Sequence, residues 1–204
     1  MKPTKRVTIR KSGRFLYPMV GVVAAVLLLG IGGFIWLTTA GKGYSIGGPF
    51  TLENSAGKTV TAADFHGKYM LVYFGYTYCP DVCPTTLNVI AVALDDLGPR
   101  AKKLVPIFIT VDPQRDTPQV MQRYTAAFSP ELIGLTGTPG EVAQVAKEYR
   151  VYYAKHVTGP SSNDYSMDHS SIIYLMGPDG KFIAPIGAEQ SPADMAAHIG
   201  KLIS

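Results

Sequence analysis

Cys79 and Cys83 are the only two cysteines of the 204-residue chain, and their spacing is suited to redox or metal chemistry. Residues four apart share one face of an α-helix, so both sulfurs could reach one small ion or each other. If Cys79 lies at or just before a helix N-terminus, the positive end of the helix dipole favours its thiolate. Thiolate is the form that binds metals and attacks disulfides. The pair therefore predicts a soft-metal site or a redox-active dithiol.

Two simpler interpretations of the pair have no functional content. A structural disulfide would close a loop of only about five residues, and it would stabilise the domain by only about 2 kcal/mol. The two cysteines could also be unrelated buried thiols. The spacing alone leaves both alternatives open.

The segment around the cysteines predicts a buried strand followed by a helix. Residues 71–74 form an apolar run rich in β-branched and aromatic side chains, which is typical of a buried strand. Pro80 suits a first helical turn, because its missing N–H would have no intrahelical partner there. Apolar residues then recur at helical spacing, so we expect a helix over about residues 80–97, ended by Gly98-Pro99.

The rest of the folded part alternates strand and helix signals. Residues 50–53 and 58–61 flank a turn and predict an N-terminal β-hairpin. Three Ser/Thr-Pro pairs each predict a helix N-cap followed by proline at the first helical position: Thr117-Pro118, Thr138-Pro139 and Ser191-Pro192. Further strands are expected over residues 104–111, 132–135, 150–156, 170–176 and 181–186. This order predicts an α/β sandwich with a mixed central sheet.

The formal net charge of +4 is concentrated at the N-terminus. Six of the 19 basic residues precede residue 15, so 13 basic and 15 acidic residues remain, a net of −2. With no basic stripe expected on the folded part, nucleic acid is not an expected partner.

The N-terminal region predicts a membrane anchor. Residues 20–39 carry no charge and would span about 30 Å as a helix, which matches the hydrocarbon core of a bilayer. The basic residues in front should stay in the cytoplasm. We therefore expect a basic cytoplasmic N-terminus over residues 1–18, a single transmembrane helix over 19–40, a Gly-rich linker over 41–48 and one folded domain over 49–204.

A cleaved signal peptide is the alternative, but its apolar core is usually only about 7–15 residues long. In both cases the domain lies outside the cytoplasm, where thiols meet oxidising conditions. The short basic leader favours a single-pass protein of a bacterial inner membrane, with a periplasmic domain, over one of a mitochondrial inner membrane.

A third metal ligand would have to come from elsewhere in the chain. Of the four histidines, His66 lies in a predicted turn, His156 near a strand end and His198 in the last helix. His169 stands at the entrance to a predicted strand, after a polar loop over residues 158–168. Judged by itself, a histidine in such a place is more often a structural or surface residue.

Three separated motifs together resemble the SCO/SenC family of copper-binding, thioredoxin-like proteins. They are GYTYCPDVCP at residues 75–84, VDPQRDTP at 111–118 and DYSMDHS at 164–170, and the resemblance covers roughly residues 46–203. The cysteine pair between the first buried strand and its helix is a thioredoxin-like arrangement, although its spacing is C-x-x-x-C rather than C-x-x-C.

The resemblance implies that Cys79, Cys83 and His169 bind copper, as Cu(I) and as Cu(II). It implies a copper chaperone, rather than an enzyme, that helps to assemble the CuA centre of cytochrome c oxidase subunit II. The implied partners are subunit II, a copper-donor chaperone and the membrane. The chemistry agrees, because soft thiolates select Cu(I) and an imidazole lets the site hold Cu(II) as well.

Two other functions remain alternatives. A thiol–disulfide oxidoreductase that keeps the cysteines of the CuA client reduced would need Cys79 and Cys83 as its catalytic pair, but not His169. A thiol peroxidase would need a threonine placed to activate peroxide at a cysteine, and Thr77 is one residue too close to Cys79 for that pattern.

For five polar residues near the motifs, the roles are hypotheses. Asp112, Arg115 and Asp116 fit capping and turn chemistry, and the functional hypothesis for them is a polar support or docking surface beside the metal loop. Asp81 adds negative charge between the cysteines and could attract a cation or contact a partner. Asp168 could orient His169.

Overall fold

The computed structural model describes residues 27–34, 46–161 and 164–203, and the chain divides into two units, Met1–Tyr44 and Ser45–Ser204. In the first unit, residues 27–34 form a helix whose large apolar side chains, such as Leu29 and Phe34, are exposed. None of the helices within the described residues combines the length and the hydropathy that crossing a membrane requires. Most of the predicted transmembrane segment, residues 19–40, lies outside the described residues.

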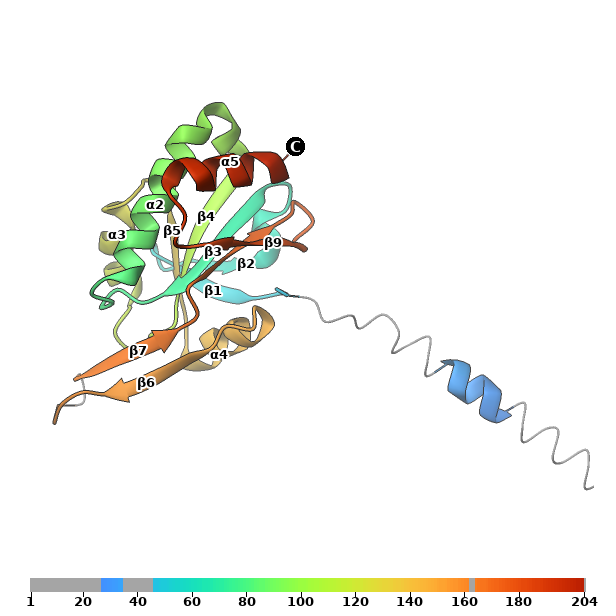
Figure 1. Ribbon diagram of the computed structural model, residues 1–204. Helices are drawn as coiled ribbons and strands as arrows, with labels where there is room; N and C mark the ends of the chain where they lie inside the picture. Colours follow the sequence, from blue (N-terminus) through green and yellow to red (C-terminus); the bar gives the residue numbers. More distant parts are fainter. Residues whose placement is uncertain (1–26, 35–45, 162–163, 204) are drawn as a thin grey trace, which may run out of the picture. The chain divides into compact units, whose positions relative to one another are not determined.

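The second unit holds nine strands and four α-helices that the structure describes (Figure 1). The strands are β1 (Thr51–Asn54), β2 (Thr59–Thr61), β3 (Tyr69–Gly75), β4 (Leu104–Thr110), β5 (Ile133–Thr136), β6 (Tyr153–Val157), β7 (Tyr165–His169), β8 (Ile172–Met176) and β9 (Phe182–Gly187). The helices are α2 (Val82–Leu97), α3 (Pro118–Ala126), α4 (Pro139–Glu148) and α5 (Pro192–Leu202), with 3-10 turns η1 (Ala62–Phe65) and η2 (Gly98–Lys103).

Seven strands form one mixed sheet in the order β2-β1-β5-β4-β3-β8-β9. The inner strand β3 runs parallel to β4 and antiparallel to β8, where Val72 pairs with Tyr174. The predicted α/β sandwich with an N-terminal hairpin and a mixed central sheet is therefore confirmed.

The strands β6 and β7 form a separate two-stranded sheet, and here the prediction was wrong in two respects. Residues 150–156 were expected in the central sheet, and residues 158–168 were expected as a loop. The segment from Tyr165 to His169 instead alternates buried and more exposed side chains, which is the period of a strand with one covered face.

The three predicted helix starts are confirmed. The side-chain oxygens of Thr117, Thr138 and Ser191 each accept a hydrogen bond from the backbone N–H three residues later, at 3.2–3.4 Å. In all three cases proline follows at the first helical position, where its missing N–H costs nothing.

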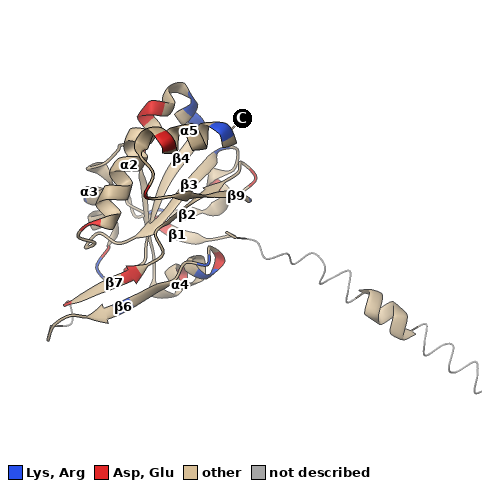
Figure 2. Cartoon of the chain, viewed as in Figure 1, with Lys and Arg blue, Asp and Glu red and all other residues tan. Residues whose placement is uncertain are grey.

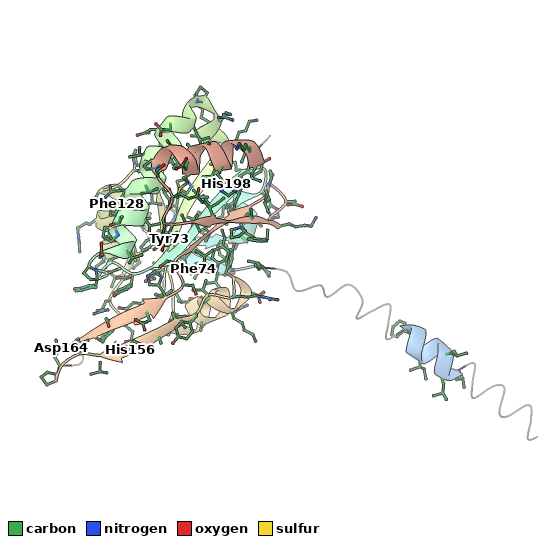
Figure 3. All side chains as sticks on the ribbon, in the orientation of Figure 1. Tyr73, Phe74, Phe128, His156, Asp164 and His198 are labelled. Atoms are coloured by element: carbon green, nitrogen blue, oxygen red, sulfur yellow. The ribbon has the colours of Figure 1, made fainter. Side chains whose placement is uncertain are left out.

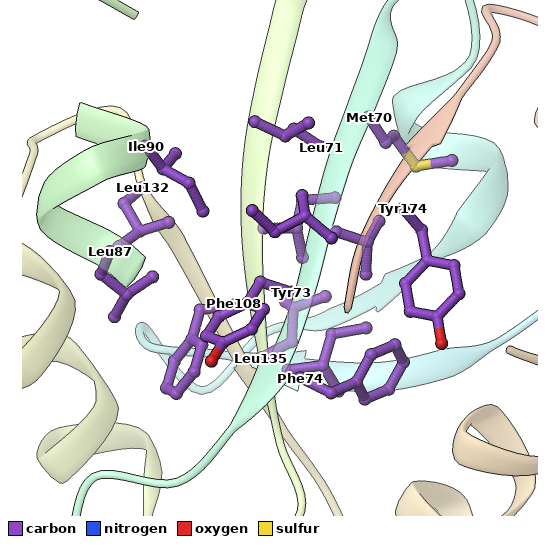
Figure 4. Close-up of a cluster of buried hydrophobic side chains, with 14 of the residues drawn as sticks. Met70, Leu71, Tyr73, Phe74, Leu87, Ile90, Phe108, Leu132, Leu135 and Tyr174 are labelled. Carbon is purple, nitrogen blue, oxygen red and sulfur yellow. The ribbon is translucent and has the colours of Figure 1, made fainter. Parts of the chain in front are cut away.

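The strand β3 is buried along its whole length, as its apolar sequence predicts. Its neighbours Tyr73 and Phe74 point to opposite faces of the sheet, because side chains alternate along a strand. The ring of Tyr73 lies 6.1 Å from that of Phe108, which lies 5.7 Å from Tyr124 of α3. On the other face Phe74 lies 5.3 Å from Tyr149, the residue after α4. Figure 4 shows Tyr73, Phe74 and Phe108 among the buried side chains around β3 and β4. This packing makes β3 a rigid base for the segment that follows it.

The linker predicted over residues 41–48 overlaps the folded unit at its end. The N–H of Gly47 donates to the carbonyl oxygen of Glu148 at 2.8 Å. Gly47 has a positive φ of 81°, and a Cβ at this position would collide with the side chain of Met176. The glycine therefore allows the chain to enter the domain in close contact with the core.

Candidate metal centre

The two cysteines lie where β3 ends and α2 begins. Cys79 lies in the loop of residues 76–81, here called the cysteine loop, and Cys83 is the second residue of α2. The helix begins at Val82, so the prediction that Pro80 opens it was wrong. The backbone of Asp81, at φ −143° and ψ −68°, is not yet helical, and this residue takes the N-cap position.

His169, the last residue of β7, completes a group with the two cysteines. Its Nε2 lies 3.2 Å from the Sγ of Cys83, and the backbone N–H of Cys83 donates to the Sγ of Cys79 at 3.3 Å. The three possible ligand atoms lie within 4.8 Å of one another. Over the described residues, this is the only group of three or more His, Cys, Asp or Glu side chains arranged to hold a metal ion.

The orientation of the His169 ring suits a ligand. Its Nδ1 lies 3.2 Å from the carbonyl oxygen of Ser170, which can only accept, so Nδ1 carries the proton. The lone pair of Nε2 then points towards the sulfurs. The rings of Tyr73 and Tyr76 meet the imidazole edge-on at centroid distances of 6.1 Å and 6.0 Å, and they limit its rotation.

Asp168 does not orient His169, contrary to the hypothesis above. Its carboxylate pairs with the Nε2 of His156 at 2.8 Å, and the two side chains are 62% and 54% exposed. Successive residues of a strand point to opposite faces, which takes Asp168 away from its neighbour. Figure 3 shows His156 on the β6–β7 hairpin and His198 on α5; neither belongs to the Cys79–Cys83–His169 group, and nor does His66.

The two thiols have very different proton affinities. The pKa of Cys79 is lowered to about 4, chiefly because the Cys83 thiol donates a hydrogen bond to its sulfur. The pKa of Cys83 is raised, because its proton holds that same hydrogen bond and because the side chain is buried. Both cysteines are free, so the pair holds one proton on Cys83 beside a half-buried Cys79 thiolate.

Charged side chains are unevenly distributed over the domain. Figure 2 shows Lys and Arg gathered near η2 and the end of α5. η2 leads into the start of β4, which pairs with the start of β3, whereas the cysteines follow the end of β3. Asp81 lies between the two cysteines in the sequence, and the guanidinium of Arg115 lies beside the cysteine loop, 4.6 Å from the centre of the Tyr78 ring. Charges of both signs therefore lie near the metal centre.

The three side chains fit a soft metal ion. Two donor atoms on one ion can lie at most about 4.6 Å apart, twice a typical metal–sulfur bond, so the group needs only slight closure. Two sulfurs and one imidazole nitrogen are donors for soft and borderline ions. The half-buried position of Cys79 leaves one side of the group open to solvent.

Gly75, the last residue of β3, makes room for the Cys83 thiol. A Cβ at this position would lie 2.7 Å from the Sγ of Cys83 and 2.8 Å from the ring of Phe108. We expect Gly75→Ala to lower the free energy of unfolding by about 1–3 kcal/mol, because both neighbours are buried and cannot retreat. Urea denaturation measures the change.

Gly140 in α4 provides the control, because a Cβ there meets nothing within 4 Å. Gly140→Ala should be neutral or stabilise the domain by up to about 1 kcal/mol. Equal unfolding midpoints for the two variants would contradict this role for Gly75.

Asp116 holds the cysteine loop through hydrogen bonds to Thr77. It is fully buried, and its carboxylate accepts hydrogen bonds from the backbone N–H of Thr77 at 3.0 Å and from the hydroxyls of Thr77 and Thr110, both at 2.6 Å. Burial raises the pKa of Asp116, and these hydrogen bonds oppose that shift. Because the Thr77 hydroxyl is bound to Asp116, it is not placed to activate peroxide at Cys79.

Local sequence patterns did not predict a functional role for Gly75, Tyr73, Tyr76 or Tyr165. The glycine that interrupts an apolar strand just before the cysteines was the one available local signal. The tyrosines act through contacts between segments far apart in the sequence, which no local pattern reveals.

Known proteins resemble this chain in sequence and in structure. A profile of the family described as SCO1/SenC matches residues 38–204. The human protein SCO1 homolog, mitochondrial, is 44% identical over 158 residues, which are 76% of this chain and 52% of that protein. SenC of Rhodobacter capsulatus is 43% identical over 162 residues, which are 79% of this chain and 72% of that protein. The chain thus spans about half the length of the human relative.

Solved structures resemble the second unit. The Bradyrhizobium japonicum protein ScoI with copper bound superposes with a TM-score of 0.71 at 46% identity, covering 78% of this chain and 99% of that one. BsSco, described as a member of the Sco family of cytochrome c oxidase assembly proteins with a disulfide switch, gives a TM-score of 0.61 at 25% identity, covering 78% and 93%. The predicted thioredoxin-like fold is confirmed by these matches.

Proposed function

Because this chain belongs to the SCO1/SenC family, we propose that it is a copper chaperone that carries its cargo on Cys79, Cys83 and His169. The observation that carries the proposal is the convergence of two sulfurs and one correctly oriented imidazole nitrogen within 4.8 Å. Thiolates favour Cu(I), and the imidazole extends the range of the site to Cu(II).

The protonation states of the two cysteines suit the binding and release of copper. Cys79 is already a thiolate, and the single proton on Cys83 has to leave when copper binds. Three protein ligands leave room for a further donor on the open side, so an incoming thiolate or imidazole can attack the ion before the protein releases it. A closed site of four protein ligands would hold its ion as a structural element instead.

The client we propose is the CuA site of cytochrome c oxidase subunit II, and the proposed source of copper is a separate donor chaperone. Support comes from the family resemblance, and from BsSco, whose family is described as cytochrome c oxidase assembly proteins. The exposed acidic side chain of Asp81, between the two cysteines in the sequence, suits a positively charged group on either partner.

We also propose a single transmembrane anchor over residues 19–40, with a cytoplasmic basic segment over 1–18 and a periplasmic domain in a bacterium. The length and lack of charge of this segment support an anchor. The exposed apolar side chains of the helix at residues 27–34 do so as well, since lipid would cover them.

Copper binding tests the proposal. The full chain, purified in detergent and kept anaerobic and reduced, should bind one Cu(I), and X-ray absorption should show two sulfur ligands and one nitrogen ligand. The variant Cys79→Ser, Cys83→Ser should bind none under the same conditions. A wild-type chain that retains no copper after gel filtration would overturn the chaperone role.

A thiol–disulfide oxidoreductase is the second candidate, and the unequal thiols favour it. The Cys79 thiolate would attack a client disulfide, form a mixed disulfide and release one client thiolate. Cys83 would then lose its proton and attack the Cys79 sulfur, which forms the internal disulfide and releases the second client thiolate. Reducing the two cysteines of a CuA site in this way would prepare them to receive copper, so the two activities are compatible.

A further inference from the structure

The side chain of Arg115 lies between the two segments that carry the proposed copper ligands. We propose that Arg115 is a positioning residue that holds the His169 strand, β7, against the cysteine loop, so that the imidazole nitrogen joins the two sulfurs. This inference rests on the proposed function, because it concerns the same site. It assigns to a residue outside the ligand set the task of keeping the three ligands together.

The need for such a contact follows from the topology. His169 is carried by the two-stranded sheet of β6 and β7, whereas Cys83 is anchored beside the seven-stranded sheet. Among the strand pairings that the structure describes, β7 pairs with β6 alone. Figure 1 shows this hairpin extending from the body of the domain. Two residues after His169 the chain enters β8, which pairs with β3, so this short link fixes one end of β7. The start of β7 has no such link, and its position relative to the cysteine loop depends on side-chain contacts.

Arg115 binds β7 in two ways. Its Nη1 donates to the carbonyl oxygen of Tyr165 at 3.0 Å, and its Cζ lies 3.6 Å from the centre of the Tyr165 ring. The Nζ of Lys155 lies 3.6 Å from the same ring centre, and two cations this close must occupy opposite faces. The Tyr165 ring is thus held between a cation of β6 and the guanidinium of Arg115.

Arg115 also meets the cysteine loop. Its Cζ lies 4.6 Å from the ring centre of Tyr78 and 5.8 Å from that of Tyr76. These residues flank Thr77, which Asp116 holds, and the Tyr76 ring in turn abuts the His169 imidazole. One planar cation therefore contacts aromatic rings from both segments at once, which a flexible lysine ammonium is poorly shaped to do.

The guanidinium is itself fixed by Asp112. The Nε of Arg115 forms an ion pair with the Asp112 carboxylate, and the two side chains are only 9% and 4% exposed. The second carboxylate oxygen of Asp112 accepts a hydrogen bond from the Tyr165 hydroxyl at 2.8 Å. Arg115, Asp112 and Tyr165 therefore form one buried network that links the loop after β4 to the start of β7.

The test compares Arg115→Lys with Arg100→Lys in the full chain. Arg100 is the matched control, because it too donates to a backbone carbonyl across the fold, that of Gly200, but it joins η2 to α5. In the copper-free proteins, we expect amide hydrogen exchange of β6 and β7 to become roughly 10-fold faster in Arg115→Lys, as expected for the loss of a desolvated cation–π contact. Exchange in β3 and β4 should not change in either variant.

The copper-loaded proteins provide the second readout. Arg115→Lys should keep both sulfur ligands, show a smaller nitrogen contribution in X-ray absorption, and release copper roughly 10- to 100-fold faster, the range for loss of an outer partner of a metal ligand. Arg100→Lys should match the wild type. Wild-type exchange in β6 and β7, together with wild-type coordination in Arg115→Lys, would overturn the proposal.

A second variant covers the case in which Arg115→Lys does not fold. Tyr78 is 64% exposed, so Tyr78→Ala leaves the core intact while it removes one ring beside the guanidinium. It should speed exchange in β6 and β7 roughly 2- to 5-fold, and no change would contradict the proposal. Since the exchange measurements need no copper, they can succeed even if the wild-type chain binds none, which would count against the proposed function alone.

Discussion

His169→Ala should leave the domain folded while copper affinity falls by more than the roughly 10- to 100-fold that loss of an outer partner costs. The reason is that the variant removes the only nitrogen donor of the proposed site and leaves two sulfurs. X-ray absorption of the loaded protein should lose its nitrogen shell, and competition with a copper chelator should measure the affinity. This variant separates the two candidate functions, because thiol–disulfide exchange does not use the imidazole.

The matched control is His156→Ala on the neighbouring strand β6. His156 pairs with Asp168 at the exposed face of the hairpin and lies outside the ligand group, so copper binding should be unchanged. If His169→Ala bound copper as the wild type does, the chaperone site would have to be placed elsewhere. Disulfide reductase activity that survives in His169→Ala, with no stable copper in the wild type, would favour the oxidoreductase.

Alkylation of Cys79 by iodoacetamide should be almost independent of pH between 5 and 7. With a pKa of about 4, this thiol is already ionised throughout that range, and it protonates only as the pH falls towards 4. An ordinary thiol, with a pKa of about 8.5, would react about 100-fold faster at pH 7 than at pH 5, because its thiolate fraction rises with pH. Mass spectrometry of the copper-free protein after timed quenching distinguishes the two profiles.

Cys83→Ala provides the informative comparison for this pH profile. The largest cause of the low pKa of Cys79 is the hydrogen bond from the Cys83 thiol. Removing that donor should raise the pKa of Cys79, so its alkylation rate should regain a dependence on pH. A steep rise in the wild-type rate between pH 5 and 7 would show instead that Cys79 is an ordinary thiol.

The sequence was most informative where the cause of a structure is local. Proline after a Ser or Thr cap predicted three helix starts, and an apolar run predicted β3. Both signals are carried by residues that are adjacent in the sequence. The strand β7 was missed because its Ser166 and Asp168 made the segment look like a polar loop. Its buried residues Tyr165 and Met167 are two apart, and this alternation was the usable signal.

The metal centre, too, was predictable from the sequence only where the signal is local. The spacing of Cys79 and Cys83 predicted a shared site, but His169 could be added only through the resemblance to a family. The sequence also could not reveal that Arg115 stacks on Tyr165, 50 residues further along the chain, or that Asp168 turns to His156. The packing of the whole domain determines which of these distant residues meet, so local propensity does not predict such contacts.

The pairing of β3 with β8 determines when the site can exist during folding. Val72 pairs with Tyr174, so the sheet closes only after most of the chain has been made. Contacts between such distant residues form late, because a large loop must first be ordered. A newly made chain therefore presents two thiols for some time before the histidine arrives. If the chain carries copper outside the cytoplasm as proposed, its cysteines are open to oxidation during that interval. Copper loading would then follow completion of the fold, and a reductant would protect the chain until then.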